Sequence, residues 1–397
     1  MTSVKQSKKE IPEEISPESS LAKSRDEIRS ITKSILDLAK ARQELSRAIS
    51  KTKVLLGQGI TNLEIEKRLL AETSAYAKAI GLDEDLAYSL VSDLIRFSKL
   101  AQSREVYRRQ IEKFLETRKI KVISIVGSGR MGSWFAKYFQ GLSSEVFLYD
   151  ERPNKAREKA RELGVGFSDS LDKVVKSDLV IISIPISKTP ELVRAISRSA
   201  RSSKVPILVE ISSVKNYMGL SGLLDESSEE QLPLYSIHPL FGGSAQSFDL
   251  NSIIQSFPKD TTLLRGLFPH FNLVSLDWKE HDLLMSLFLT YPHILALTFA
   301  DALNLEGNLW TSGISLNGPS YLHMLELSRK VLSEDPEVYY EIQASNPNSK
   351  QAIANLMNSL LKVEKALDSR SDFVEFFEKA RKKIDALDKS RTKLVPE

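Results

Sequence analysis

A glycine-rich turn carries the clearest chemical signal in this chain. Gly127, Gly129 and Gly132 follow the apolar run VISIV and precede the helical run WFAKYFQGL. A further strand-like run, EVFLYD, ends in Asp150 about twenty residues on, which completes the spacing of a dinucleotide-binding βαβ unit. In such a unit the glycines let the backbone approach a pyrophosphate, and the helix N-terminus faces its charge. The same predicted site includes the turn residues Ser128, Arg130 and Met131.

Asp150 bears on which nucleotide the turn would hold. A carboxylate at this position accepts hydrogen bonds from the adenosine ribose and repels a 2′-phosphate, so it favours NAD over NADP. Arg152 acts in the opposite direction, because a nearby arginine can bind that phosphate. The run LVIISIPI places Ser183 and Pro185 at the sheet edge where the cofactor should lie. Both residues are therefore predicted to contact it.

Two of the five histidines lie where a proton could be moved. His238 follows the strand-like run LPLYSI and precedes Pro239, at the sheet edge that should meet the cofactor. An imidazole with an unperturbed pKa of about 6.5 suits a general base, although a histidine in a His-Pro pair can equally cap a loop. His293 lies twelve residues after His281 in an apolar helical run. A core or interface position is the simpler interpretation of His293 from the residues alone.

Cations on an apolar helix face are the third chemical feature. In the first helical segment, Arg42 and Lys53 fall on a stripe of isoleucines and leucines, and Arg25 lies at its margin. Burying an isolated charge is costly, so these cations need partners. The partners could be carboxylates of neighbouring helices, or a dicarboxylate or phosphate ligand. Further along, Ser98 and Gln102 continue an apolar row, so polar groups again face inward.

Three kinds of element must position these residues. Residues 21–118 have helical periodicity with breaks at residues 57–59 and 81–83, which predicts an all-α domain of three helices. Strand and helix alternate over residues 119–276, which predicts an α/β doubly wound Rossmann domain. Residues 277–397 predict an all-α C-terminal domain, with its first helix interrupted by Pro292. The polar residues 1–20 are predicted to form a disordered tail.

Composition excludes several classes of function. The 55 basic and 52 acidic residues leave a net charge of +3, which gives no footprint for nucleic acid. No apolar stretch approaches the roughly 18 residues of a membrane span, so no membrane association is expected. The absence of cysteine excludes disulfides, thiolate nucleophiles and cysteine-ligated zinc, and no metal site is predicted. It also fits a cytoplasmic protein.

The front segment resembles the all-helical chorismate mutase family over about ninety residues. The resemblance rests, at the family's spacings, on Arg25, Arg42, Lys53, Glu66, Ser98 and Gln102. It implies an intertwined homodimer in which Arg42, Lys53 and an Arg25 from the partner chain hold the carboxylates and ether oxygen of chorismate. The other three residues would complete the pocket. The rearrangement needs no base. It needs hydrogen-bond donors and positive charges that restrict the substrate's conformation and stabilise its developing negative charge.

The remaining chain resembles the prephenate dehydrogenases, especially those preceded by a mutase. The resemblance rests on the glycine-rich turn and on the segments EISSVK (210–215), SIHPLFGG (236–243) and HDLLMSLFLTYPH (281–293). It implies that His238 takes the proton of the prephenate ring hydroxyl as hydride leaves for NAD, and that His293 faces the substrate. Ser213 and Lys215 would hydrogen-bond His238 or the substrate and meet a substrate carboxylate.

One position departs from the mutase pattern. That family usually has an arginine just before the matched glutamate, where this chain has Ile65. Lys67 or Arg68 on the next turn could replace it. An alternative interpretation therefore keeps the dehydrogenase, for prephenate or arogenate, and treats the front bundle as a degenerate mutase that serves dimerisation or regulation.

A second departure affects the dehydrogenase. The family commonly presents an arginine in a Pro-x-Tyr-Arg pattern, where this chain has Leu322. His323 or Arg329 could compensate. A non-enzymatic, nucleotide-dependent regulatory protein is the remaining alternative. His281 and Asp282 are expected to be helix-start and packing residues.

Overall fold

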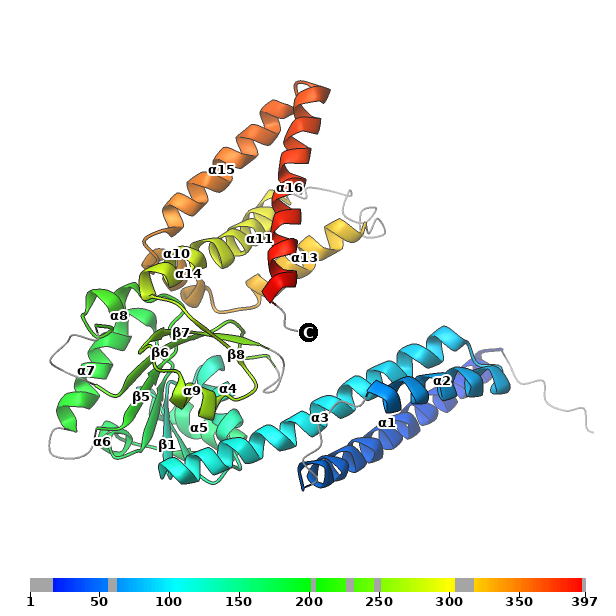
Figure 1. The fold of residues 1–397 in the computed structure, drawn as a ribbon, viewed down its shortest axis with the longest axis horizontal. Coiled ribbons are helices and arrows are strands. Elements are labelled where there is room, and N and C mark those ends of the chain that lie inside the picture. The colour runs from blue at the N-terminus through cyan, green and yellow to red at the C-terminus, as the bar shows by residue number, and fades with distance from the viewer. Residues whose placement is uncertain are drawn as a thin grey trace, which may run out of the picture. The chain divides into compact units, whose positions relative to one another are not determined.

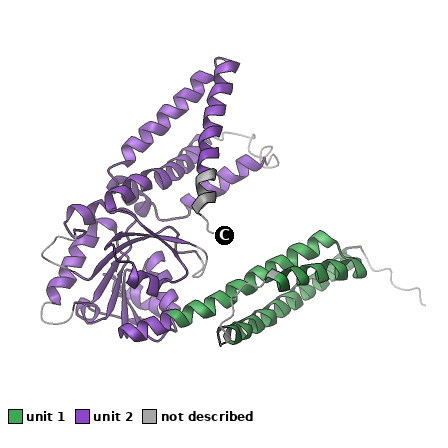
Figure 2. Cartoon of the chain, in the orientation of Figure 1, with its two compact units in different colours: residues 1–110 green, residues 111–397 purple. Residues whose placement is uncertain are grey.

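The computed structural model describes residues 17–55, 63–200, 205–225, 232–245, 251–303 and 318–394. The chain divides into two compact units, residues 1–110 and residues 111–397 (Figure 2). The first unit is helical, and the second combines a sheet with a set of C-terminal helices (Figure 1).

The described part of the first unit consists of α1 (Pro17–Leu55), α2 (Leu63–Ile80) and α3 (Glu84–Arg118), the last of which continues into the second unit. Gly81 follows α2 with a φ of +72°, and Asp83 Oδ1 accepts the amide of Leu86 at 2.8 Å. A left-handed glycine and an aspartate cap are the signals that predicted this break, and the break is confirmed. Residues 1–16 and 57–59 lie outside the described residues, and α1 begins within the predicted tail.

Eight strands form one sheet in the order β3-β2-β1-β4-β5-β6-β7-β8. They are β1 (Val122–Val126), β2 (Glu145–Tyr149), β3 (Gly166–Phe167), β4 (Leu179–Ile182), β5 (Ile207–Glu210), β6 (Leu234–Pro239), β7 (Ser252–Phe257) and β8 (Asn272–Ser275). All neighbouring pairs are parallel except β6 and β7. The strand order reverses between β1 and β4, where doubly wound sheets bind ligands at their carboxyl edge. The predicted doubly wound class is confirmed.

Helices cover both faces of this sheet (Figure 1). They are α4 (Arg130–Phe139), α5 (Pro153–Leu163), α6 (Leu171–Val175), α7 (Thr189–Ser199), α8 (Asn216–Leu220) and α9 (Thr262–Leu267), with a 3₁₀ turn at Ile186–Lys188. Because side chains alternate along a strand, Ile125 of β1 joins one core with Phe135 of α4, whereas Val126 joins the other with Val193 of α7. The parallel strands are thus buried on both sides, which fixes the carboxyl edge that carries the site.

The C-terminal helices are α10 (Trp278–Phe288), α11 (Thr290–Ala302), α13 (Pro319–Leu332), α14 (Pro336–Ser345), α15 (Ser349–Ala366) and α16 (Arg370–Leu394). Pro292 lies in the first turn of α11 and offers no N–H to the carbonyl of Phe288, so the predicted interruption is confirmed and falls at Leu289. By length and composition alone, the stretch Trp278–Ala302 could cross a membrane, so the expectation that no segment approaches this length is wrong. The stretch is broken, however, and carries the buried polar residues His281 and Asp282.

Candidate active sites

The glycine-rich turn joins β1 to α4 at the switch point of the sheet. Gly127 has a φ of +100°, and a Cβ there would lie 2.0 Å from the carbonyl oxygen of Ser183. A Cβ on Gly132 would lie 1.9 Å from the carbonyl oxygen of Gly127. By contrast, nothing lies within 4 Å of a Cβ built on Gly129. Two glycines are therefore required by packing, and the third leaves open space beside the N-terminus of α4, as a bound pyrophosphate would need.

Asp150 follows β2 and is tied to the turn. Its Oδ2 accepts the amide and the hydroxyl of Ser128 at 2.9 and 2.8 Å, and its Oδ1 accepts the amide of Arg152 at 3.0 Å. Burial raises the pKa of Asp150, but these hydrogen bonds and the charge of Arg152 outweigh that effect and leave the pKa below its ordinary value. Asp150 therefore remains a carboxylate beside the predicted ribose position.

A cavity of about 2000 Å³ lies at the carboxyl edge of the sheet, between the strands and the C-terminal helices. Of the nine predicted cofactor residues, it is lined by Gly127, Gly129, Arg130, Met131, Asp150, Ser183 and Pro185. Ser128 and Gly132 are buried behind it. Three predicted catalytic residues, Ser213, His238 and His293, line the same cavity. The fold thus brings the cofactor turn and the candidate base to one space.

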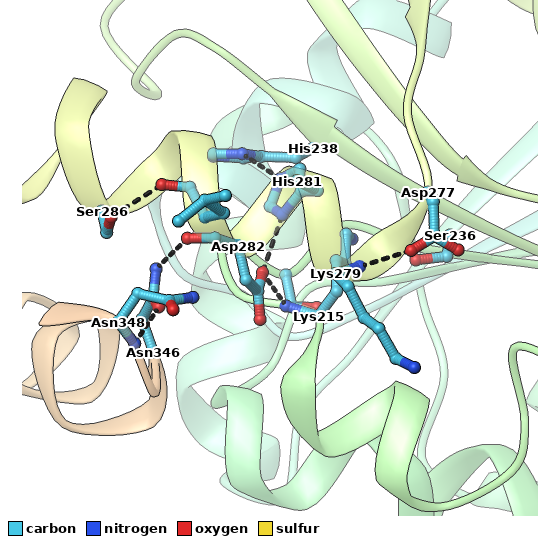
Figure 3. A network of polar contacts seen from close by, with 12 residues as sticks. Lys215, Ser236, His238, Asp277, Lys279, His281, Asp282, Ser286, Asn346 and Asn348 are labelled. Carbon is cyan, nitrogen blue, oxygen red and sulfur yellow. Dashed lines mark hydrogen bonds and ion pairs between the residues drawn. The ribbon is translucent and has the colours of Figure 1, made fainter.

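His238 begins a buried chain of hydrogen bonds (Figure 3). Its Nδ1 lies 3.0 Å from His281 Nε2, and His281 Nδ1 lies 2.8 Å from Asp282 Oδ1. A carboxylate only accepts, so His281 carries its proton on Nδ1 and accepts at Nε2. His238 then donates from Nδ1, which leaves its Nε2 unprotonated for the cavity. His281 and Asp282 lie near the start of α10 and are buried, as expected of helix-start and packing residues, and they also form this hydrogen-bonded chain.

Burial keeps His238 and His281, the two histidines of this hydrogen-bonded network, uncharged. Burial lowers the pKa of His238 well below the ordinary 6.5, and charges on His281 and Lys215 lower it further. The pKa of His281 is lowered by burial as well, although its bond to Asp282 opposes the shift. A neutral imidazole is the form that can accept a proton, so the environment favours the base form of His238.

Lys215 does not meet a substrate carboxylate, and that prediction is wrong. Its side chain is fully buried, and Nζ donates to Glu210 Oε1 and to the carbonyl of Ile237, both at 2.7 Å. Glu210 also accepts from the hydroxyls of Ser212 and Ser236. The amide of Lys215 donates to Asp282 Oδ1 at 2.8 Å. A buried ion pair is tolerable only with such a complete set of partners, and here it ties β5 and β6 to the helix that carries His281.

His293 lines the cavity from α11, the second of the C-terminal helices. Its Nδ1 lies 3.1 Å from Gln343 Nε2, its ring centroid lies 4.3 Å from that of Tyr339, and burial lowers its pKa to about 4. His323 and Arg329, offered as replacements at the Leu322 departure, are not among the cavity residues. The cations that line the cavity are Arg130, Arg152, Lys155, Lys188 and Lys330. Arg130 pairs with Glu334.

The helical unit holds a second cluster of predicted residues. Arg42 of α1 donates to the hydroxyl of Ser98 and to the carbonyl of Leu94, both on α3, and burial lowers its pKa. Gln102 lies one turn on from Ser98 and is buried, and its Oε1 has no hydrogen-bond partner among the described residues. Glu66 of α2 pairs with Lys99 of α3. Three helices therefore contribute polar side chains to one region.

The apolar stripe of α1 does not form a core within this unit. Its members are 49% to 71% exposed and are Ile28, Ile31, Ile35, Leu38, Leu45 and Ile49. Helix α3 covers the neighbouring face of α1, where Ser46 and Ser50 are buried. Arg25 is exposed and Lys53 half-buried. Within one chain the stripe stays exposed, because the small residues on the adjacent face are the ones along which α1 and α3 approach each other. Arg68 pairs with Glu72 on its own helix, 3.2 Å apart.

Three family models match successive parts of the chain. Residues 24–103 match chorismate mutase type II, residues 122–213 match NADP oxidoreductase coenzyme F420-dependent, and residues 277–381 match the prephenate dehydrogenase dimerization domain. A T-protein of Enterobacter agglomerans is 24% identical over 333 residues, which cover 82% of each chain. Together these matches make the chain similar to chorismate mutases in its first part and to prephenate dehydrogenases in its second.

Two further matches each cover about two thirds of this chain. A probable arogenate/prephenate dehydrogenase of Methanocaldococcus jannaschii is 23% identical over 273 residues, which cover 66% of this chain and 60% of that protein. Among solved structures, the A. aeolicus prephenate dehydrogenase in complex with hydroxyphenyl propionate and NAD+ has a TM-score of 0.54 at 20% identity. The match covers 67% of this chain and 98% of that one, and it shows a shared fold.

Proposed function

We propose that this chain catalyses two consecutive reactions. The helical unit rearranges chorismate to prephenate, and the second unit oxidatively decarboxylates prephenate to 4-hydroxyphenylpyruvate with NAD+. The observation that carries the proposal is the shared cavity, in which the glycine-rich turn lies at one side and the neutral, hydrogen-bonded His238 at another.

The residues of the turn fit a dinucleotide. Gly129 leaves open space at the N-terminus of α4, and Asp150 remains charged at the ribose position. When bound, NAD+ accepts a hydride at its nicotinamide ring. The matched family model is named for NADP, but Arg152 Nε lies 3.5 Å from Asp150 Oδ1, so its charge is turned toward that carboxylate. We therefore favour NAD, which the A. aeolicus structure also contains.

His238 supplies the base for the second reaction. Its Nε2 accepts the proton of the ring hydroxyl as hydride leaves the carbon that bears this hydroxyl. The bond to the ring carboxylate then breaks, carbon dioxide leaves, and the released electron pair makes the ring aromatic as a phenolate, whose oxygen takes back the proton that His238 accepted. His281 and Asp282 hold the imidazole in the required tautomer and stabilise the charge that forms on it. Ser213 and His293 face the same cavity and would contact the substrate.

The first reaction uses charged donors rather than a base. Arg42, Lys53, Ser98 and Gln102 would hold chorismate, with Glu66 beside them, and an Arg25 from a second copy would complete the pocket. The exposed apolar stripe of α1 supports a homodimer, since an exposed row of large apolar residues requires cover. The match of residues 277–381 to a dimerization domain agrees with this. A cytoplasmic location is part of the same proposal.

One experiment tests both halves. The purified full-length chain is incubated with chorismate, with and without NAD+, while prephenate and NADH are followed separately. We expect prephenate in both mixtures and NADH only with NAD+. Prephenate without any NADH would contradict the dehydrogenase half. NADH that forms from supplied prephenate but not from chorismate would contradict the mutase half.

A further inference from the structure

An ion pair joins α2 to α3 in the helical unit. Lys99 Nζ lies 3.0 Å from Glu66 Oε2, and the two side chains are 37% and 21% exposed. Among the described residues of this unit, other ion pairs link neighbours three or four residues apart on one helix, as in Arg29–Asp26, Arg68–Glu72, Arg96–Asp93 and Arg109–Glu105. Pairs of that kind contribute little and carry no information about a site. The Lys99–Glu66 pair differs because it joins two helices, and it is also partly buried.

Lys99 lies directly beside the cluster proposed to bind chorismate. It follows Ser98, whose hydroxyl accepts a hydrogen bond from Arg42. Consecutive residues of a helix point about 100° apart, so Ser98 can face α1 while Lys99 faces α2. Residues 98 and 99 thus connect the arginine on one neighbouring helix with the glutamate on the other. Gln102, with its unpartnered Oε1, lies one turn further on.

Lys99 offsets negative charge in this cluster. Chorismate carries two carboxylates, and Glu66 adds a third negative charge to the same region. Residue 65 is an isoleucine, 61% exposed, and contributes no cation. Lys67 is exposed, and Arg68 pairs with Glu72. Among the described residues of α2 and α3, Lys99 is the cation in contact with Glu66.

We infer that Lys99 is a positioning residue of the mutase site, which rests on the proposed mutase function. It holds the Glu66 carboxylate in place and supplies from α3 the positive charge that α2 lacks at Ile65. Without it, Glu66 would repel the dianionic substrate and offset one of the remaining cations.

The test compares three single variants of the full-length chain by kcat and KM for chorismate. Lys99→Met is expected to lower kcat/KM by about tenfold to hundredfold, since truncating one member of a partly buried charge pair leaves the other unpaired. Lys99→Arg keeps the charge and should retain most activity. Lys78→Met is the matched control, which removes an exposed lysine from the far end of α2, and should leave kcat/KM unchanged.

A rescue separates this role from a purely structural one. Adding Ile65→Arg to Lys99→Met returns a cation to the pocket from α2 and should recover at least part of the lost kcat/KM, whereas a helix-packing role predicts no recovery. Far-UV circular dichroism of the same preparations reports whether the helical unit of each variant is folded, and oxidation of supplied prephenate reports on the second unit. The inference is overturned if Lys99→Met matches an active wild-type chain, or if Ile65→Arg restores nothing. A wild-type chain that rearranges no chorismate would instead contradict the proposed function itself.

Discussion

The two sites differ in how much of each is built within one chain. In the second unit, the polar network behind His238 is buried within the single chain, and its members are Glu210, Lys215, His281 and Asp282. In the helical unit, Arg42 and Ser98 meet, but Arg25 is exposed and so is the apolar stripe. A general base must present one unprotonated atom at a fixed position. This requires surroundings that are rigid and shielded from water. A rearrangement needs several donors around an anion, and these can come from separate helices or separate chains.

Replacing His238 should lower prephenate oxidation and leave chorismate rearrangement unchanged. His238→Asn is expected to lower NADH formation from supplied prephenate by about 10²- to 10⁴-fold, which is the usual contribution of a general base. The rate of chorismate disappearance should not change. Stopped assays of prephenate and NADH on the same preparation measure both. A parallel loss of both activities in a folded protein would mean that the two sites are not separate.

The role of the exposed apolar stripe of α1 can be tested by placing a charge on it. Leu38 is 71% exposed in the single chain, and a charge at this position would be buried in the proposed dimer. Leu38→Glu should lower mutase kcat/KM on the order of a hundredfold, since it disfavours the pairing that completes the pocket. Oxidation of prephenate should be retained. Lys40→Glu changes charge on the opposite face of α1 and serves as the control, and equal effects of the two variants would contradict a role for the stripe.

The hydrogen-bond chain behind His238 should matter less than His238 itself. Asp282→Asn keeps the shape but replaces an acceptor with a group that can also donate, so His281 loses its fixed tautomer. We expect prephenate oxidation to fall by roughly tenfold to hundredfold, a fraction of the general-base contribution. Asp277→Asn, at the cap of α10, keeps a capping side chain and should have wild-type rates. Wild-type kinetics for Asp282→Asn would show that the hydrogen bonds from Asp282 through His281 to His238 have no part in catalysis.

The smallest expected effect is on stability against pH. Burial lowers the pKa of His238, His281 and His293, that of His293 to about 4. Below pH 6.5 the unfolded chain therefore binds protons that the folded unit does not, so the free energy of unfolding falls as pH drops from about 6.5 toward 4. All five histidines and all three tryptophans lie in the second unit.

Urea titrations between pH 7.5 and 5.5 can therefore separate the units. Tryptophan fluorescence reports the second unit, and its midpoint should move to lower urea as pH falls. His293→Gln should reduce that movement. An unchanged midpoint across this range would contradict the lowered pKa values.

The sequence predicted the parts of the fold that depend on local pattern. Short apolar runs separated by helical segments predicted β1, β2, β4 and β6, and Gly81 with Asp83 predicted a helix break. Strand β7, which pairs antiparallel with β6, and the edge strand β8, which pairs with β7, were missed, because their places in the sheet depend on this pairing.

The site was predictable only in part. The glycine turn and His238 follow from sequence and family resemblance, but the partners of Lys215 do not. Lys215 looks like a substrate ligand until the fold places Glu210 against it. The adjacent pair His281-Asp282 was visible as a dipeptide before an apolar helix, and an acidic residue beside a histidine is a signal that could have been weighed. Contacts between distant segments depend on tertiary structure, which the local pattern does not contain.

The exposed stripe on α1 has a consequence for how the protein behaves on dilution. A pocket completed by a second copy follows mass action, so its occupancy falls as the chain becomes scarce, whereas hydrogen bonds inside one chain do not. The ratio of chorismate rearrangement to prephenate oxidation should therefore depend on enzyme concentration. At low abundance this chain would act mainly on prephenate that it did not make.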